Sequence, residues 1–173
     1  MWAAALGVAC CAGCTYQVSG DFNPDVNPTY AWRSLYREDI QTVAVPIFTT
    51  KSFSRGVEVG LTRAVIQQIE LRTPYKVVSR DRAQTILEGE IEAVEVETVS
   101  SSSRTLLPQE QMMTLRVNFV WKDIRTGRVL VERRSFTQSA TYYPTLGEGR
   151  FVGMQTATER LAVAIVQQLE ADW

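Results

Sequence analysis

The sequence contains no histidine, and its cysteines are Cys10, Cys11 and Cys14, all near the start of the 173-residue chain. Without histidine there is no Ser-His-Asp or Cys-His nucleophile pair, no imidazole base and no His-ligated zinc or haem. After Cys14 there is no thiol for a disulfide or a cysteine metal site. We therefore predict no cofactor, no metal site and no enzyme activity. Paired carboxylates are the one catalytic arrangement that composition leaves open.

The sequence also lacks an excess of charge of either sign. It has 18 Lys and Arg against 19 Asp and Glu, a net charge of -1, which gives no general attraction to nucleic acid. Hydrophobic residues make up 45% of the chain, with 10 Gly and 6 Pro. This balance is typical of a globular protein, and the length fits one domain.

Residues 1–13 carry no charge and are mostly small and apolar. This segment is too short to cross a bilayer as a helix, which takes about 20 residues, but it has the length of a signal-peptide apolar region. It ends in Cys11-Ala12-Gly13-Cys14, which resembles the lipobox of bacterial lipoproteins, although Cys11 stands where leucine is usual and no basic residue comes first. In such proteins the signal peptide is cut before the cysteine, whose thiol carries a diacylglycerol.

We therefore predict a signal peptide over residues 1–13 and lipidation of Cys14. The alternatives are an ordinary apolar amino terminus, and acylation of Cys10, which fits the pattern less well. Thr15 follows Cys14 where an aspartate would favour the inner membrane of a bacterium, so the pattern favours the outer membrane. Residues 14–39, dense in turn-forming residues, are predicted to be the lipidated amino terminus and a tether.

Residues 40–173 are predicted to form the folded domain. Residues 41–48 read as a covered strand, with Val43, Val45 and Ile47 on one face. Ser54 is predicted to cap a helix that ends at Thr73-Pro74, and residues 75–79 form a second strand. Strand, helix and strand in this order predict a parallel crossover.

From residue 86 the apolar period becomes two, which predicts antiparallel strands joined by hairpins. A change of phase predicts a β-bulge at Ala93-Val94. The inward residues of the next strand are predicted to be Met113, Leu115, Val117, Phe119 and Trp121. The phase of the last strand, from Val129 to Thr137, is not determined by the pattern. A closing helix follows, with an apolar face from Met154 to Leu169, and runs nearly to Trp173.

Both predicted helices have a single apolar stripe, so one face of one sheet receives both of them. The predicted fold class is α+β, a two-layer sandwich with two helices packed on one face of a mixed sheet of four to five strands.

The only carboxylate cluster lies on the strand after residue 86. Its members are Glu88, Glu90, Glu92, Glu95 and Glu97. Alternate strand residues stand about 6.7 Å apart, which is within the range of a glycosidase acid pair. The cluster has no companion base, so a solvated face or a charged stripe toward a partner is the favoured interpretation.

Two hairpins carry candidate contacts with a partner or with lipopolysaccharide. A basic group surrounds the second hairpin, where solvation alone is the alternative, and an apolar pair stands on the first, where burial against the sheet edge is the alternative. The candidate contacts are Lys122, Arg125, Arg128, Arg104, Leu106 and Leu107, with Arg133 and Arg134 nearby.

The order of motifs resembles the lipopolysaccharide-assembly lipoprotein family LptE, also called RlpB. The matching segments are the lipobox-like cysteine, Thr42-Val43-Ala44-Val45-Pro46-Ile47-Phe48, the helix over residues 56–71, Tyr75-Lys76-Val77-Val78-Ser79 and residues 83–89, followed by hairpins and a closing helix. The resemblance implies a lipid-anchored, non-enzymatic protein on the periplasmic face of the outer membrane. In that family the protein is a plug in the β-barrel LptD and assists delivery of lipopolysaccharide, which it is implicated in contacting.

Two other functions stay open at this point. The strand before the helix also resembles the start of domains in curli-secretion and Tol-type proteins, so a lipoprotein of another secretion apparatus is the alternative. An enzyme acting through the glutamates is the more distant one.

Overall fold

The computed structural model describes residues 35–170, and the predictions for residues 1–34, including lipidation of Cys14, lie outside this part. The first described elements are strand β1 (Thr42–Ala44), strand β2 (Thr49–Thr50), helix α1 (Val57–Arg72) and strand β3 (Lys76–Val77). β1 pairs in parallel with β3 and also with the strand that follows, β4. The predicted parallel connection through a helix is confirmed.

Three long strands then form a meander: β4 (Thr85–Ser101), β5 (Pro108–Asp123) and β6 (Val129–Tyr142). They pair antiparallel in sequence order, and the sheet runs β3-β1-β4-β5-β6 with β2 parallel to β4. The sheet is mixed, as predicted, but it has six strands where four to five were expected. The extra strand is β2, which has only two residues and no apolar alternation to reveal it.

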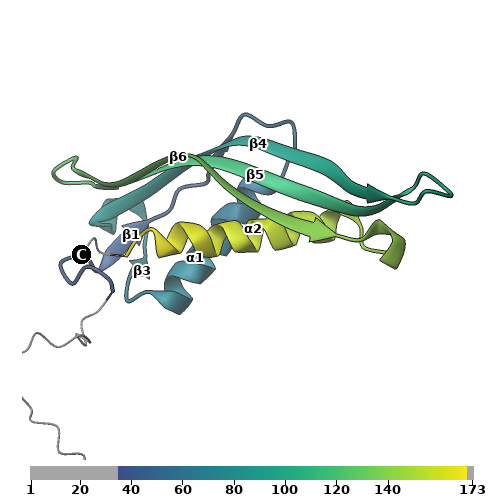
Figure 1. The fold of residues 1–173 in the computed structure, drawn as a ribbon. Helices are drawn as coiled ribbons and strands as arrows, with labels where there is room; N and C mark the ends of the chain where they lie inside the picture. Colours follow the sequence, from purple (N-terminus) through teal and green to yellow (C-terminus); the bar gives the residue numbers. More distant parts are fainter. Residues whose placement is uncertain (1–34, 171–173) are drawn as a thin grey trace, which may run out of the picture. The chain divides into compact units, whose positions relative to one another are not determined.

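Helices α1 and α2 (Arg150–Gln167) lie together on one face of the sheet (Figure 1). The inward residues of β5 are those predicted, and all are at most 1% exposed. They pack with Leu61, Val65 and Ile69 of α1 and with Leu161 and Ile165 of α2 in one hydrophobic core. The two-layer α+β fold is therefore confirmed, and the other face of the sheet is free to carry charged side chains.

The first strand and the start of α1 differ from prediction. β1 ends at Ala44, two residues before Pro46, and Ile47 is 65% exposed where burial was expected. Proline cannot donate a ladder hydrogen bond, so pairing stops before it. Ser54 does not cap α1; Gly56 occupies the cap position with a φ of 88° and no side-chain cap.

Bulges explain the phases of the long strands. The phase change in β4 occurs between Ile91 and Ala93, one residue earlier than predicted. In β6 the register shifts twice, and Ser135 has a positive φ of 48° while its N–H donates to Asn118 Oδ1 at 2.7 Å. An extra residue reverses the side-chain alternation at each bulge, so no single phase fits β6.

Gly89 lies in β4 directly against the ring of Phe48. A Cβ at this position would overlap the ring, and Phe48 is only 2% exposed, so it has little room to move. We expect Gly89→Ala to lower the free energy of unfolding by about 1–3 kcal/mol, measured by urea denaturation. Gly60→Ala is the matched control, because Gly60 faces open space and should not destabilise. Equal stability of the two variants would contradict this account of β4.

Candidate functional site

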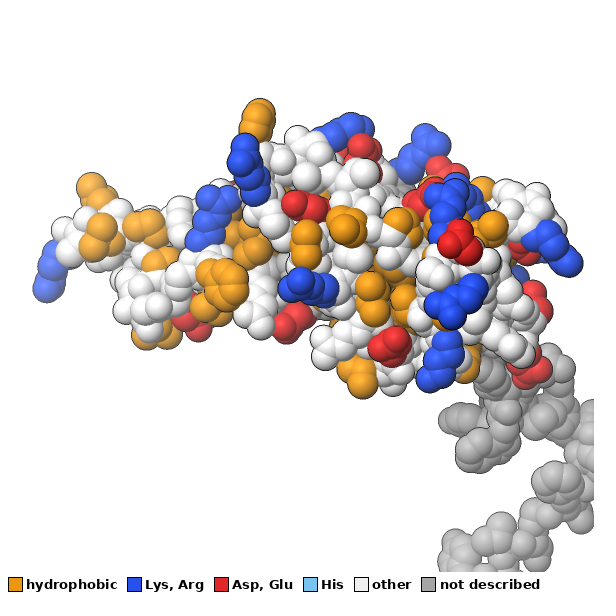
Figure 2. All heavy atoms as spheres, turned by 180° about the vertical axis from the view of Figure 1, so that it is seen from behind, with side chains coloured by type: hydrophobic (Ala, Val, Ile, Leu, Met, Phe, Trp, Pro, Cys, Tyr) orange, Lys and Arg blue, Asp and Glu red, His pale blue; other side chains and the backbone are white. Residues whose placement is uncertain are grey.

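The turn between β4 and β5 projects beyond the helices and presents apolar side chains to solvent (Figures 1 and 2). Leu106 is 81% exposed and Leu107 is 61% exposed. The turn is closed by hydrogen bonds from Leu106 N–H to Ser102 O at 2.8 Å and from Ser102 N–H to Leu107 O at 2.9 Å. Of the two outcomes considered for this pair, burial and exposure, the structure shows exposure. We call residues 102–107 the hairpin tip.

Leu106 also has a strained backbone. Its φ is 57°, in the left-handed region that favours glycine or asparagine. Backbone strain and exposure to water both make this leucine unfavourable when no partner is bound. Backbone outliers of this kind are concentrated at functional positions. The hairpin tip is therefore a candidate contact surface.

The basic group at the other hairpin divides between two surfaces: Lys122, Arg133 and Arg134 line one hollow, and Arg125 and Arg128 line another. Lys122 Nζ lies 2.6 Å from Glu88 Oε2 in an ion pair on the open sheet face. Arg125 and Arg128 lie in the exposed turn after β5. In that turn the Asp123 carboxylate accepts N–H bonds from Thr126 and Arg125, which hold the pKa of Asp123 below its ordinary value.

Two further arginines on β6 are held by other side chains. Arg134 pairs with Glu132 at 2.9 Å, and Arg133 Nε donates to Gln168 Oε1 at 2.9 Å. The remaining basic residue of the predicted site, Arg104, lies on the hairpin tip. β5 has 16 residues between the two turns, so Arg104 and Arg125 are separated by roughly 50 Å. The predicted contacts therefore lie in two groups at opposite ends of β5, with Arg104, Leu106 and Leu107 on the hairpin tip and the other residues at the turn after β5.

Three of the five glutamates of the β4 cluster are paired with cations on the open sheet face. Glu90 pairs with Lys51 at 2.8 Å, and this hydrogen bond raises the pKa of Lys51. Glu88 faces Lys122 and Arg80, and Glu95 lies 3.6 Å from Arg116. Carboxylates held in ion pairs are poorly placed to act as an acid and a nucleophile, so the charged stripe is the better interpretation.

Two classes of site find no support in residues 35–170. No group of three or more metal-ligating His, Cys, Asp or Glu residues comes together in this part of the chain. Neither α1 nor α2 combines the length and apolar composition of a membrane-crossing helix.

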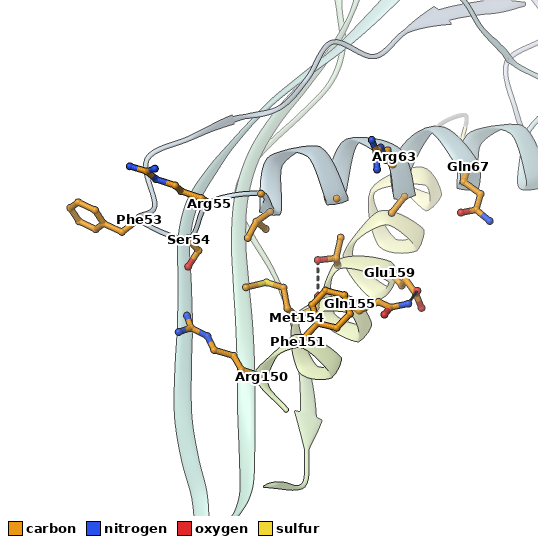
Figure 3. Close-up of a pocket in the computed structure, with 15 residues that line it drawn as sticks. Phe53, Ser54, Arg55, Arg63, Gln67, Arg150, Phe151, Met154, Gln155 and Glu159 are labelled. Atoms are coloured by element: carbon orange, nitrogen blue, oxygen red, sulfur yellow. Dashed lines mark hydrogen bonds between the residues drawn. The ribbon is translucent and has the colours of Figure 1, made fainter. Parts of the chain in front are cut away.

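Sequence reasoning missed a groove between the amino-terminal halves of α1 and α2 (Figure 3). Its volume is about 740 Å³. In Figure 3 Phe151 and Met154 lie between the helices, Arg55 and Arg150 extend at the open end, and Arg63 stands on α1. One feature of the sequence could have indicated this groove: an arginine stands at the start of each helix, where its positive charge opposes the helix dipole.

Residues 40–172 match the family model LptE, described as lipopolysaccharide-assembly. This match spans most of the chain. The protein belongs to the LptE family. Membership assigns this LptE-family chain to lipopolysaccharide assembly in the cell envelope, and to a family that is not enzymatic, in agreement with the resemblance read from its motifs.

Solved structures share the fold of this LptE-family protein. PelC from Paraburkholderia phytofirmans, a dodecamer, is 14% identical with a TM-score of 0.56, covering 79% of this chain and 93% of that chain. Uncharacterized lipoprotein B from Nitrosomonas europaea is 15% identical with a TM-score of 0.52, covering 76% and 83%. Hypothetical protein CT253 from Chlamydia trachomatis is 11% identical with a TM-score of 0.51, covering 74% and 96%. A search of curated proteins found no match.

Proposed function

We propose that this LptE-family protein is anchored by acyl chains on Cys14 to the periplasmic face of the outer membrane. There it is the plug partner of an LptD-like β-barrel and assists delivery of lipopolysaccharide to the cell surface. The observation that carries this proposal is the hairpin tip, where Leu106 and Leu107 are exposed at the end of a long projecting hairpin. An apolar tip of this kind is stabilised when a partner removes it from water.

The charged groups support a partner-bound, non-catalytic protein. Three of the five glutamates, Glu88, Glu90 and Glu95, are in ion pairs, whereas no ion pair within residues 35–170 involves Arg104, Arg125 or Arg128. Guanidinium groups bind phosphate in a bidentate manner, so these three arginines are the proposed contacts with the phosphates of lipopolysaccharide.

Co-purification tests the proposed partner. The full chain, extracted from outer membranes with mild detergent, should bring with it a β-barrel protein of the LptD type in equimolar amount. A ring of this chain alone would contradict the plug proposal. It would instead support the alternative of another secretion apparatus, for which the shared fold with the dodecameric PelC is the specific observation.

The lipid anchor has its own test. Each buried methylene contributes about 0.8 kcal/mol, so two or three acyl chains hold a protein on a membrane lastingly. We expect Cys14→Ala to move the protein from the membrane fraction to the soluble periplasmic fraction, and mass spectrometry of the wild type to show acyl chains on Cys14. Cys10→Ala is the control and should leave the distribution unchanged. Membrane association that survives Cys14→Ala but not Cys10→Ala would place the anchor at the other cysteine.

A further inference from the structure

The groove between α1 and α2 has an excess of positive charge. Arg55, Arg63 and Arg150 stand around it, and among residues 35–170 none of the three takes part in an ion pair. The one carboxylate in its lining, Glu159, accepts a hydrogen bond from Gln155 Nε2 at 3.0 Å. With three arginines and one glutamate in its lining, the groove is complementary to a partner with several negative charges.

The groove also has apolar walls that are open to water. Phe151 is 76% exposed, and Phe53 at the entrance is fully exposed. Met154, a flexible side chain that adapts to different shapes, lines the floor between the helices. These apolar side chains can pack against one aromatic or large aliphatic side chain of a ligand.

The remaining lining favours a polypeptide over an acyl chain. Gln67 and Gln155 bring amide groups to the groove, and Thr158, whose hydroxyl donates to Met154 O at 2.7 Å, also lines it. An acyl chain would bury these groups without supplying hydrogen bonds, which disfavours binding. A peptide main chain supplies both donors and acceptors to them. These polar groups therefore favour a peptide over an anionic lipid, although the arginines alone would bind either one.

Gly60 adds a feature that the isolated fold does not need. It lies within α1 and lines the groove, and a Cβ there would meet nothing within 4 Å. Glycine in a helix is less stable than alanine by about 0.5–1 kcal/mol, and here no packing requires it. Its absent side chain allows another main chain to come close to the helix.

We propose that this groove binds an acidic segment of a separate protein. Carboxylates of the segment pair with Arg55, Arg63 and Arg150, and one aromatic or large aliphatic side chain packs against Phe151 and Met154. This surface belongs to the helical layer and does not include the hairpin tip, so the inference stands or falls independently of the plug proposal.

Peptide selection tests the proposal. The full chain, purified in mild detergent, is used to enrich a display library of random peptides, with the Arg63→Glu/Arg150→Glu variant as the negative selection. We expect enriched peptides to combine several Asp or Glu residues with a Phe, Trp or Leu. In fluorescence titration the best of them should bind the double variant about tenfold more weakly or worse, and lose affinity as salt rises. Arg82→Glu, an exposed charge reversal outside the groove, is the matched control and should bind like the wild type.

Gly60→Ala separates binding from folding. Alanine should leave the melting temperature equal or higher, while it reduces peptide affinity about fivefold or more by filling the point of close approach. Circular dichroism is measured on the same samples to show that the variant is folded when its peptide affinity is determined.

Four results would overturn the proposal. The first is a selection that yields no peptide, or basic peptides that the double variant binds equally. The second is a Gly60→Ala variant that binds like the wild type. The third is hexyl phosphate, a soluble anionic amphiphile, binding as tightly as the best peptide with the same dependence on Arg63 and Arg150, which would assign the groove to a lipid. The fourth is self-association of the chain that the double variant abolishes, which would assign it to a second copy.

Discussion

Trp121→Ala is expected to lower the free energy of unfolding by about 3–5 kcal/mol, a large part of the 5–15 kcal/mol typical of a domain. Trp121 lies on the inner face of β5 and is fully buried, with its ring centroid 5.8 Å from that of Tyr75. Removing the indole leaves a cavity at a place where the sheet and the segment after α1 meet. Urea denaturation followed by circular dichroism measures the loss.

Trp121→Phe is the control for this prediction. The indole Nε1 is buried and has no hydrogen-bond partner within residues 35–170, so phenylalanine removes an unpaired donor while it keeps most of the packing. We expect the Phe variant to lose about 1–2 kcal/mol at most. A cost below about 1 kcal/mol for Trp121→Ala would show that the inner face of β5 has been assigned incorrectly.

The Leu106→Asp/Leu107→Asp variant is expected to abolish co-purification of the β-barrel partner while the free energy of unfolding stays within about 0.5 kcal/mol of wild type. Both side chains are largely exposed, so the isolated fold loses little packing. A buried interface, by contrast, would have to desolvate two carboxylates. The measurement is the amount of barrel recovered with the affinity-tagged full chain.

Leu71→Asp is the matched control, since Leu71 is 69% exposed at the end of α1, away from the hairpin tip. Leu106→Gly gives a second, independent test. Glycine adopts the φ of 57° without strain, so this variant should be as stable as wild type or more so, and still bind the barrel less well. Full recovery of the barrel with both tip variants would exclude the hairpin tip as its contact surface.

Regular alternation made much of the fold predictable. The five inward residues of β5 follow a strict period of two, and the apolar stripe of α1 follows the helical period. The bulge in β4 was predicted to within about one residue, because a change of phase in the side-chain alternation requires one extra residue. Elements without periodicity were missed or misplaced, such as the two-residue β2 and the cap of α1.

The candidate sites were less predictable than the fold. Exposure of Leu106 and Leu107 was one of two outcomes that the pattern allowed, and their contact with a partner stays a prediction. The basic residues looked like one group because they are close in sequence. The structure divides them, since Lys122 and Arg133 line one hollow whereas Arg125 and Arg128 line another.

The amino-acid sequence by itself determined which catalytic and metal-binding residue types are missing, which strand and helix faces are apolar, and the order of motifs that marks the LptE family. These properties are local, because they depend on residue type and on periods of two or 3.6 along one segment. Only the tertiary structure decided which charges are neutralised across strands and which leucines project into water. It also decided that Arg150, far along the chain from Arg55 and Arg63, lines one groove with them. Such features arise when segments that are far apart in the sequence pack together. The period within one segment does not indicate which distant segment it will contact.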